Sequence, residues 1–222
     1  MSVFRIQGDR PLSGSVRVQG AKNSVLPILA ATFLSTGVCV LHNCPWLSDV
    51  EHTLDILRHL GCKVERDGET VTVDASTPTG CSVPDSLMRE MRSSVIFLGP
   101  VLGRMGRSEL TYPGGCELGP RPIDLHLSAL RALGAEIGER NGRLVAEGEL
   151  TGADITLSIA SVGATENAML AAVAAKGITT ITNAAREPEI VDLQNFLRTL
   201  GAKIRGAGSS VIVIEGGVPL HG

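Results

Sequence analysis

The chain has 222 residues and a formal net charge of −3, and it is 43% hydrophobic, 19% charged and only 3% aromatic. This composition is typical of a globular protein with an aliphatic core and excludes a disordered chain. The absence of a basic surplus argues against nucleic-acid binding, and no apolar run has the length of a membrane span. A cytoplasmic protein without nucleic-acid or membrane partners is therefore expected.

The first predicted elements form a unit of helix, strand, helix and hairpin. Residues 1–6 alternate between apolar and polar side chains like a strand. A helix of small apolar residues is predicted over 23–34, followed by a strand over 38–41. A second helical pattern ends at Gly61, where a glycine can take the left-handed conformation that ends helices, and a hairpin-like stretch follows over 62–73.

The same order of elements returns twice along the chain. The five-residue pattern Leu-Arg-x-Leu-Gly marks the end of the second helix in each unit, at 57–61, 130–134 and 197–201. The remaining elements of the later units are expected in matched places: helices over 92–102 and 165–175, strands over 109–112 and 178–181, and hairpins over 135–145 and 202–214.

Three repeats of one unit predict a single α/β domain. One unit cannot bury both faces of its helices, whereas three units around a common pseudo-threefold axis can. We place the repeats at about 21–75, 90–148 and 160–216 within a domain of residues 21–222. The helices over 23–34 and 165–175 are apolar nearly all round, so they are expected in the interior.

The middle unit carries an insertion. Gly37 and Gly61 lie 24 positions apart, as do Gly177 and Gly201, whereas Gly106 and Gly134 lie 28 positions apart. The extra residues fall in the loop at 113–122, and insertions in one copy of a repeat often map to a functional loop.

Cys116 is the candidate reactive group of this loop. Two glycines precede it and Gly119-Pro120 follows it, so the backbone can approach a ligand and expose the thiol. Arg121 could favour the thiolate or bind an anion. The alternative is an ordinary buried cysteine, which is the commoner fate of single cysteines. The insertion and the glycines favour a catalytic thiol.

The other cysteines predict neither a disulfide framework nor a metal site. The total of five is odd, and no Cys-x-x-Cys pair occurs. Cys39 and Cys44 flank His42, which suggests a metal, but a fourth ligand at finger spacing is not evident. Buried structural thiols are the favoured interpretation.

Lys22 and Asn23 lie at the predicted start of the first buried helix. A helix N-terminus offers free N–H groups and a positive dipole that suit a phosphate or carboxylate. The alternative is a surface lysine beside an N-cap asparagine. The matching helix starts of the other units lie at 90–94 and 161–165. If the three starts converge, they form one polar, anion-binding site.

Asp124 and His126 follow the loop. Asp124 is either a favourable acid in the first turn of a helix or an acceptor for hydroxyl or amide groups of a ligand. His126 is interpreted as a solvated helix residue, since no serine elbow accompanies it. The sequence has no Walker loop, no Gly-x-Gly-x-x-Gly after a strand and no His-Glu-x-x-His.

Together these segments resemble the UDP-N-acetylglucosamine 1-carboxyvinyltransferases, the enolpyruvyl transferases that commit carbon to peptidoglycan. The matching segments run the whole length of the chain and are 20–23, 91–93, 113–116, 121–126, 161–165 and 183–189. The resemblance implies an inside-out α/β barrel domain of three repeats. It also implies transfer of the enolpyruvyl group of phosphoenolpyruvate to the sugar 3-hydroxyl with release of phosphate, without a cofactor or metal.

The resemblance assigns roles to individual residues. Cys116 becomes the general acid that protonates the enol carbon, and it is the thiol that fosfomycin would alkylate. The residues expected to bind phosphoenolpyruvate are Lys22, Asn23 and Arg121. Those expected to bind UDP-N-acetylglucosamine are Arg92, Arg121, Pro122, Ile123, Asp124, Leu125, Ser161, Val162 and Gly163.

The chain is about half as long as members of this family, which have two such domains. The resemblance implies that residues 1–20 pack with a second, C-terminal domain that is missing here and that supplies the base for the sugar hydroxyl. The chain is thus expected to be a fragment that is inactive alone. One alternative is a domain that binds a nucleotide sugar without turnover. A transferase for another acceptor is a further alternative, which the Cys116 loop disfavours.

Overall fold

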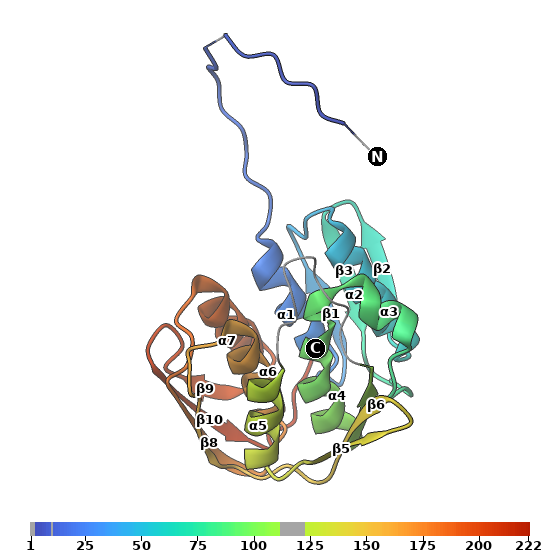
Figure 1. Cartoon of the computed structure of the whole chain (residues 1–222), viewed down its shortest axis with the longest axis vertical. Helices are drawn as coiled ribbons and strands as arrows, with labels where there is room; N and C mark the ends of the chain where they lie inside the picture. The colour runs from blue at the N-terminus through green and yellow to red at the C-terminus, as the bar shows by residue number, and fades with distance from the viewer. Residues whose placement is uncertain (1–2, 10, 112–122) are drawn as a thin grey trace.

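The computed structural model of the chain describes residues 3–9, 11–111 and 123–222. The described part of the N-terminal segment extends away from the folded body (Figure 1). It forms no β-strand in the described residues, contrary to the expectation from its alternating sequence. A strand needs a neighbour to satisfy its backbone groups, and none of the described sheets includes this segment.

The first unit runs from α1 to β3. Its elements are α1 (Lys22–Thr32), β1 (Val38–Leu41), α2 (Ser48–His59), β2 (Lys63–Asp67) and β3 (Thr70–Asp74). The strands form a sheet in the order β1-β3-β2 with antiparallel pairing throughout. The turn between α2 and β2 places Gly61 at φ 94°, where only a glycine is unstrained.

The second unit has a broken inner helix. Its elements are α3 (Asp85–Glu90), the 3-10 helix η1 (Arg92–Phe97), α4 (Leu98–Met105), β4 (Arg107–Leu110), α5 (Asp124–Ala132), β5 (Glu136–Arg140) and β6 (Arg143–Glu147). The sheet order β4-β6-β5 repeats that of the first unit. The strand predicted over 109–112 lies two residues earlier, because Gly106 takes a left-handed φ of 70° and ends α4 at Met105.

The third unit adds one strand to the common pattern. Its elements are β7 (Asp154–Thr156), α6 (Val162–Ala172), β8 (Gly177–Thr182), α7 (Pro188–Thr199), β9 (Lys203–Arg205) and β10 (Val211–Gly216). The sheet order is β7-β8-β10-β9, in which β7 pairs with β8 in parallel. The sequence pattern did not predict β7, a strand of only three residues.

The inner helices lie between the three sheets and form the core (Figure 1). In α6 the residues from Ala164 to Ala172 are all buried, and most of α1 from Val25 onwards is buried as well. Helix α6 contacts α4, α5 and α7, and α1 contacts α2 and α7. This arrangement confirms the predicted α/β class with three repeated units and interior helices.

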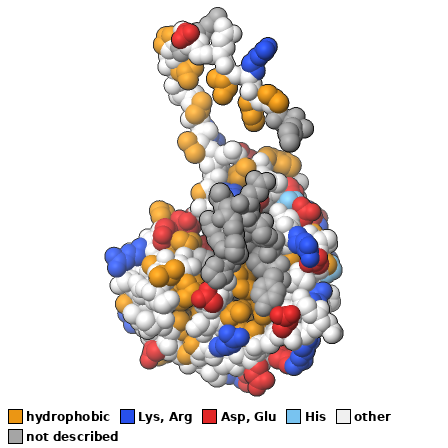
Figure 2. Space-filling model, viewed as in Figure 1, with side chains coloured by type: hydrophobic (Ala, Val, Ile, Leu, Met, Phe, Trp, Pro, Cys, Tyr) orange, Lys and Arg blue, Asp and Glu red, His pale blue; other side chains and the backbone are white. Residues whose placement is uncertain are grey.

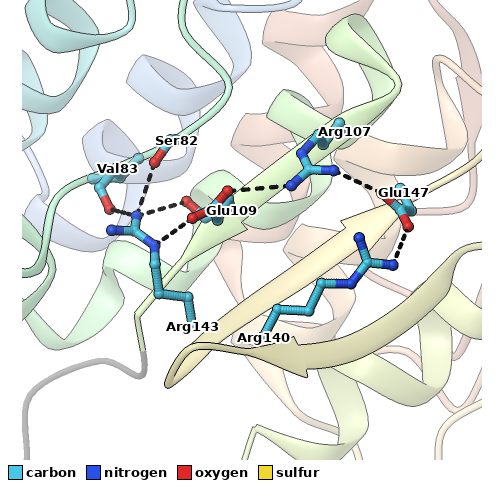
Figure 3. A network of polar contacts seen from close by, with 7 residues as sticks. All are labelled: Ser82, Val83, Arg107, Glu109, Arg140, Arg143 and Glu147. Carbon is cyan, nitrogen blue, oxygen red and sulfur yellow. Dashed lines mark hydrogen bonds and ion pairs between the residues drawn. The ribbon is translucent and has the colours of Figure 1, made fainter.

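A network of charged side chains ties the second sheet to the preceding loop (Figure 3). Arg143 on β6 places Nε 2.7 Å from Glu109 Oε1 on β4, and its Nη2 donates to the Val83 carbonyl at 2.8 Å. Arg107 donates to Glu147 at 2.8 Å, and Arg140 donates to the same carboxylate at 2.8 Å. These contacts hold β4, β5 and β6 together on the solvent side, where each exposed pair contributes modestly.

The N-terminal segment exposes apolar side chains that a folded body normally covers (Figure 2). The most exposed are Val3, Phe4, Ile6, Leu12, Val16 and Val18, with exposed fractions of 84–99%.

Among the described residues, no helix is both long and apolar enough to cross a membrane.

Candidate functional site

Several predicted site residues lie outside the part of the chain that the structure describes. Cys116, Arg121 and Pro122 fall in residues 112–122. Arg92 begins η1, and only its backbone position is described. The predicted roles of these residues therefore stay predictions.

Lys22 is the first residue of α1, and its side chain is about half exposed. Its Nζ lies 2.6 Å from Asp49 Oδ2, in the first turn of α2. The N-cap residue of α1 is Ala21, with no side-chain cap, so the interpretation of Asn23 as an N-cap is wrong. Helix α1 begins at Lys22, one residue before the helix that the sequence predicts over 23–34.

Asn23 points instead towards the start of α7. Its Nδ2 lies 3.5 Å from Glu189 Oε1, in the first turn of that helix. Acidic side chains are favourable at a helix N-terminus because they face its positive dipole. Through Lys22 and Asn23 the structure thus brings the starts of α1, α2 and α7 together. The sequence predicts a different convergence, of the starts of α1, η1 and α6. Within this set of helices, α1 contacts η1.

Glu166 on α6 adds a buried acid to this region. It is 8% exposed, and burial, reinforced by the charges of Glu189 and Glu187, raises its pKa to about 8. The carboxyl is therefore largely protonated at neutral pH. A protonated Glu166 limits the repulsion that the three carboxylates would otherwise exert on one another.

The start of α6 is fixed by its own side chains. Ser161 is the N-cap residue, and its Oγ accepts a hydrogen bond from Ala164 N. Thr165 Oγ1 donates to the Ser161 carbonyl at 2.8 Å and accepts from Ala185 N at 3.0 Å. Val162 and Gly163 form the first turn and are partly exposed. This predicted binding segment is therefore held by hydrogen bonds of its own side chains and is partly exposed.

The second predicted segment, Ile123–Leu125, reaches α6 through His126. Asp124 is the first residue of α5 and is exposed, which fits both a favourable first-turn acid and a ligand acceptor. An ideal Cβ on Gly163 would lie 3.1 Å from His126 Cε1, so the imidazole packs directly on the backbone of α6. The two predicted nucleotide-sugar segments are thus neighbours in space.

The sequence pattern predicts His126 to be solvated, and this prediction is wrong. It is 9% exposed, and its Nδ1 lies 3.0 Å from Asn167 Nδ2. Burial lowers the pKa of His126 to about 4, although the charge of Asp124 opposes the shift. The helical pattern alone could not place this face of α5 inwards, because that requires the position of α6.

Sequence reasoning missed four polar residues of this region, namely Asp49, Glu166, Asn167 and Glu189. Glu189 lies inside the matched segment 183–189, so a signal for it existed. The other three are single polar residues in helical patterns. Nothing in their spacing distinguishes them from solvated residues, and only the packing of α2 and α6 reveals their neighbours.

The cysteines near His42 behave as structural thiols. Cys39 and Cys44 are buried, and burial raises the pKa of both. His42 Nδ1 lies 3.1 Å from Thr70 Oγ1 instead of facing either thiol. Among the described residues, no group of three or more His, Cys, Asp or Glu side chains is arranged to hold a metal ion.

The chain folds into an α/β domain of three repeated units, with polar residues gathered where several helices begin. A family model described as EPSP synthase (3-phosphoshikimate 1-carboxyvinyltransferase) matches residues 6–222. The chain belongs to this family.

Curated relatives match the chain from end to end. It is 53% identical over 222 residues to UDP-N-acetylglucosamine 1-carboxyvinyltransferase 2 of Caldanaerobacter subterraneus subsp. tengcongensis, covering 100% of this chain and 53% of the relative. It is 48% identical over 225 residues to the UDP-N-acetylglucosamine 1-carboxyvinyltransferase of Idiomarina loihiensis, covering 100% of this chain and 54% of that protein. The chain therefore spans about half the length of the curated relatives it matches.

Solved structures show the same fold. The enolpyruvyl transferase NikO from Streptomyces tendae superposes with a TM-score of 0.83 at 27% identity, covering 95% of this chain and 50% of that one. An EPSP synthase from Acinetobacter baumannii gives a TM-score of 0.70 at 23% identity, covering 94% of this chain and 48% of that one. The latter likeness concerns the fold alone.

Proposed function

We propose that the chain is part of a UDP-N-acetylglucosamine 1-carboxyvinyltransferase. In the proposed reaction the sugar 3-hydroxyl adds to C2 of phosphoenolpyruvate while Cys116 protonates C3. The hydroxyl proton passes to a base of the second domain. Elimination then removes a proton from C3 and phosphate from C2, which restores the double bond and leaves the enolpyruvyl ether. The observation that carries the proposal is the similarity to enzymes of this name along the whole chain, with the Pro-Gly-Gly-Cys segment present at 113–116.

Lys22, at the start of α1, supports a phosphoenolpyruvate site at Lys22, Asn23 and Arg121. Lys22 is half exposed and is held by Asp49, so an anion that approaches finds an oriented cation. Because the substrate carries up to three negative charges, further cations are required close by. We assign Arg121 to this task, together with groups from a second domain.

The neighbouring segments Ile123–Leu125 and Ser161–Gly163 are proposed to bind UDP-N-acetylglucosamine, with Arg92, Arg121 and Pro122. The free N–H groups at the start of α6 suit a diphosphate. The described packing of His126 against Gly163 keeps the two segments adjacent, as one nucleotide sugar that contacts both would require.

A second domain completes this proposal. The chain spans half of its relatives, and the N-terminal segment exposes apolar side chains that need a partner. We propose that residues 1–20 pack against that domain, that 21–222 form the three-repeat domain described above, and that the protein acts in the cytoplasm in peptidoglycan synthesis.

The test is phosphate release from phosphoenolpyruvate that depends on UDP-N-acetylglucosamine. The chain is expressed together with the remaining half of the Caldanaerobacter relative, and phosphate is measured enzymatically. Release is expected from the combined halves and not from the chain alone. The variant Cys116→Ser should lose at least about 100-fold in rate, since general acid catalysis contributes that much.

Cys81→Ser is the matched control, because Cys81 is a half-buried thiol outside the proposed site. It should keep the rate of the wild-type chain. An unchanged rate in Cys116→Ser would overturn the assignment of the acid, and release of phosphate by the chain alone would overturn its dependence on a second domain.

The alternative is a domain that binds the nucleotide sugar without turnover, and the names of the curated relatives favour the transferase over it. Isothermal titration of UDP-N-acetylglucosamine into the chain alone separates this alternative from an inert fragment. Binding without release of phosphate by the combined halves would favour the alternative over the transferase.

A further inference from the structure

Asn167 in the middle of α6 has both ends of its amide fixed by backbone groups. Its Oδ1 accepts a hydrogen bond from Gly99 N at 2.6 Å, and its Nδ2 donates to the Val95 carbonyl at 2.9 Å. A backbone N–H can only donate and a carbonyl can only accept. The orientation of the amide therefore follows from its partners, and the side chain is fully buried.

This orientation determines the protonation of His126. The second hydrogen of Asn167 Nδ2 faces His126 Nδ1 at 3.0 Å, so Nδ1 must be the acceptor and cannot carry a proton. The neutral imidazole then carries its proton on Nε2, next to Gly163. The low pKa of the buried ring agrees with a neutral imidazole.

The ring lies so close to Gly163 that a side chain at this position would have to displace it by a few tenths of an ångström. A Cβ there would lie 3.1 Å from Cε1 and 3.3 Å from Nε2 of His126. The ring edge with the Nε2 proton thus lies against the first turn of α6, and Nδ1 is bonded to Asn167 further along the same helix, so His126 joins α5 to α6 at two points.

We propose that Asn167 and His126 are positioning residues of the nucleotide-sugar site. Asn167 holds His126 in the Nε2–H form, and His126 in turn fixes Asp124 and Leu125 against Val162 and Gly163. The inference rests on the proposed function, because it is the nucleotide sugar that would need both segments in one fixed relation. It adds two residues that touch no reacting atom.

Asn167→Asp tests the arrangement, because a carboxylate accepts hydrogen bonds and cannot donate one. The tautomer is read in the chain without ligand at pH 7 by long-range 1H–15N NMR, with the His126 ring identified by its loss in His126→Gln. The wild-type ring should be protonated at Nε2 only. In Asn167→Asp the proton should move to Nδ1, or the ring should become doubly protonated.

Binding of UDP-N-acetylglucosamine is then measured by calorimetry for the same proteins. Asn167→Asp should weaken it about tenfold or more, since a buried partner is lost. Asn141→Asp, the same change in the turn between β5 and β6, should leave both tautomer and affinity unchanged. Backbone 1H–15N spectra confirm that each variant is folded.

The possible failures are distinguishable. A wild-type ring protonated at Nδ1 overturns the inference without any ligand, even if Asn167→Asp fails to fold. Unchanged affinity in a folded Asn167→Asp with an altered tautomer overturns the positioning role alone. Absence of binding by the wild-type chain overturns the proposed binding function of this half and the inference with it.

Discussion

At the scale of single residues, burial decides which thiols and acids can react. Burial raises the pKa of the Cys62 thiol to about 11, and it raises the pKa of the Cys39 and Cys44 thiols too. Since the thiolate is the reactive form, all three should resist alkylation.

Fosfomycin followed by peptide mass spectrometry tests this expectation. Label is expected at Cys116 before any other thiol, because the proposed site concentrates anionic ligands there. Iodoacetamide serves as a reagent without affinity for the site, and with it Cys81 should react faster than Cys39, Cys44 or Cys62. Fosfomycin label on Cys39 or Cys62 in place of Cys116 would show that the reactive thiol is assigned wrongly.

Glu166 makes stability depend on pH. Its pKa is about 8 in the folded chain and close to 4.3 in an unfolded one, so the folded state holds the proton more tightly between these values. The free energy of unfolding should therefore decrease as the pH rises through this window. Glu166→Gln removes this ionisation. The free energy of unfolding of the variant, relative to that of the wild-type chain, should therefore be higher at pH 8 than at pH 4.5, by on the order of a few kcal/mol.

Urea unfolding of both proteins at the two pH values measures this difference. Glu149→Gln is a suitable control, because this carboxylate is exposed and pairs only with Lys176 at 3.0 Å among the described residues. A Glu166→Gln variant that gains no stability at pH 8 would show that the folded state does not favour the protonated acid.

At the scale of elements, close contact between inner helices is the main requirement. A Cβ on Gly99 of α4 would lie 2.4 Å from Asn167 Oδ1 and 2.6 Å from the Asn167 carbonyl oxygen on α6. Gly99→Ala should therefore separate the helices and lower the free energy of unfolding by about 1–3 kcal/mol. Gly138→Ala on β5 meets nothing within 4 Å and should not destabilise the chain. Thermal unfolding of the two variants checks the contrast.

At the scale of the whole molecule, the described N-terminal segment stands apart from the three units (Figure 1). Deletion of residues 1–18 should leave the unfolding temperature of the body almost unchanged, because the apolar side chains from Val3 to Val18 bury little surface. The same deletion should reduce self-association of the chain through these exposed apolar side chains, which sedimentation velocity measures. A large loss of stability would mean that the segment belongs to the folded body.

Some features of this protein follow from the sequence by itself. The recurrence of Leu-Arg-x-Leu-Gly and the matched glycines predict the three units, because helix ends and tight turns depend on local backbone preference. Gly61, Gly134 and Gly201 indeed have φ between 94° and 101°. The apolar periodicity likewise predicts α1 and α6 as interior helices.

Only the tertiary structure decided which polar side chains meet. Asn23 with Glu189 and His126 with Asn167 are separated by 166 and 41 positions in the chain. Their proximity depends on how the units pack around one another, which no local pattern encodes. For the same reason the sequence pattern predicts the wrong environment for His126. Whether this face of α5 is exposed or buried depends on α6, and that contact forms only when the core assembles.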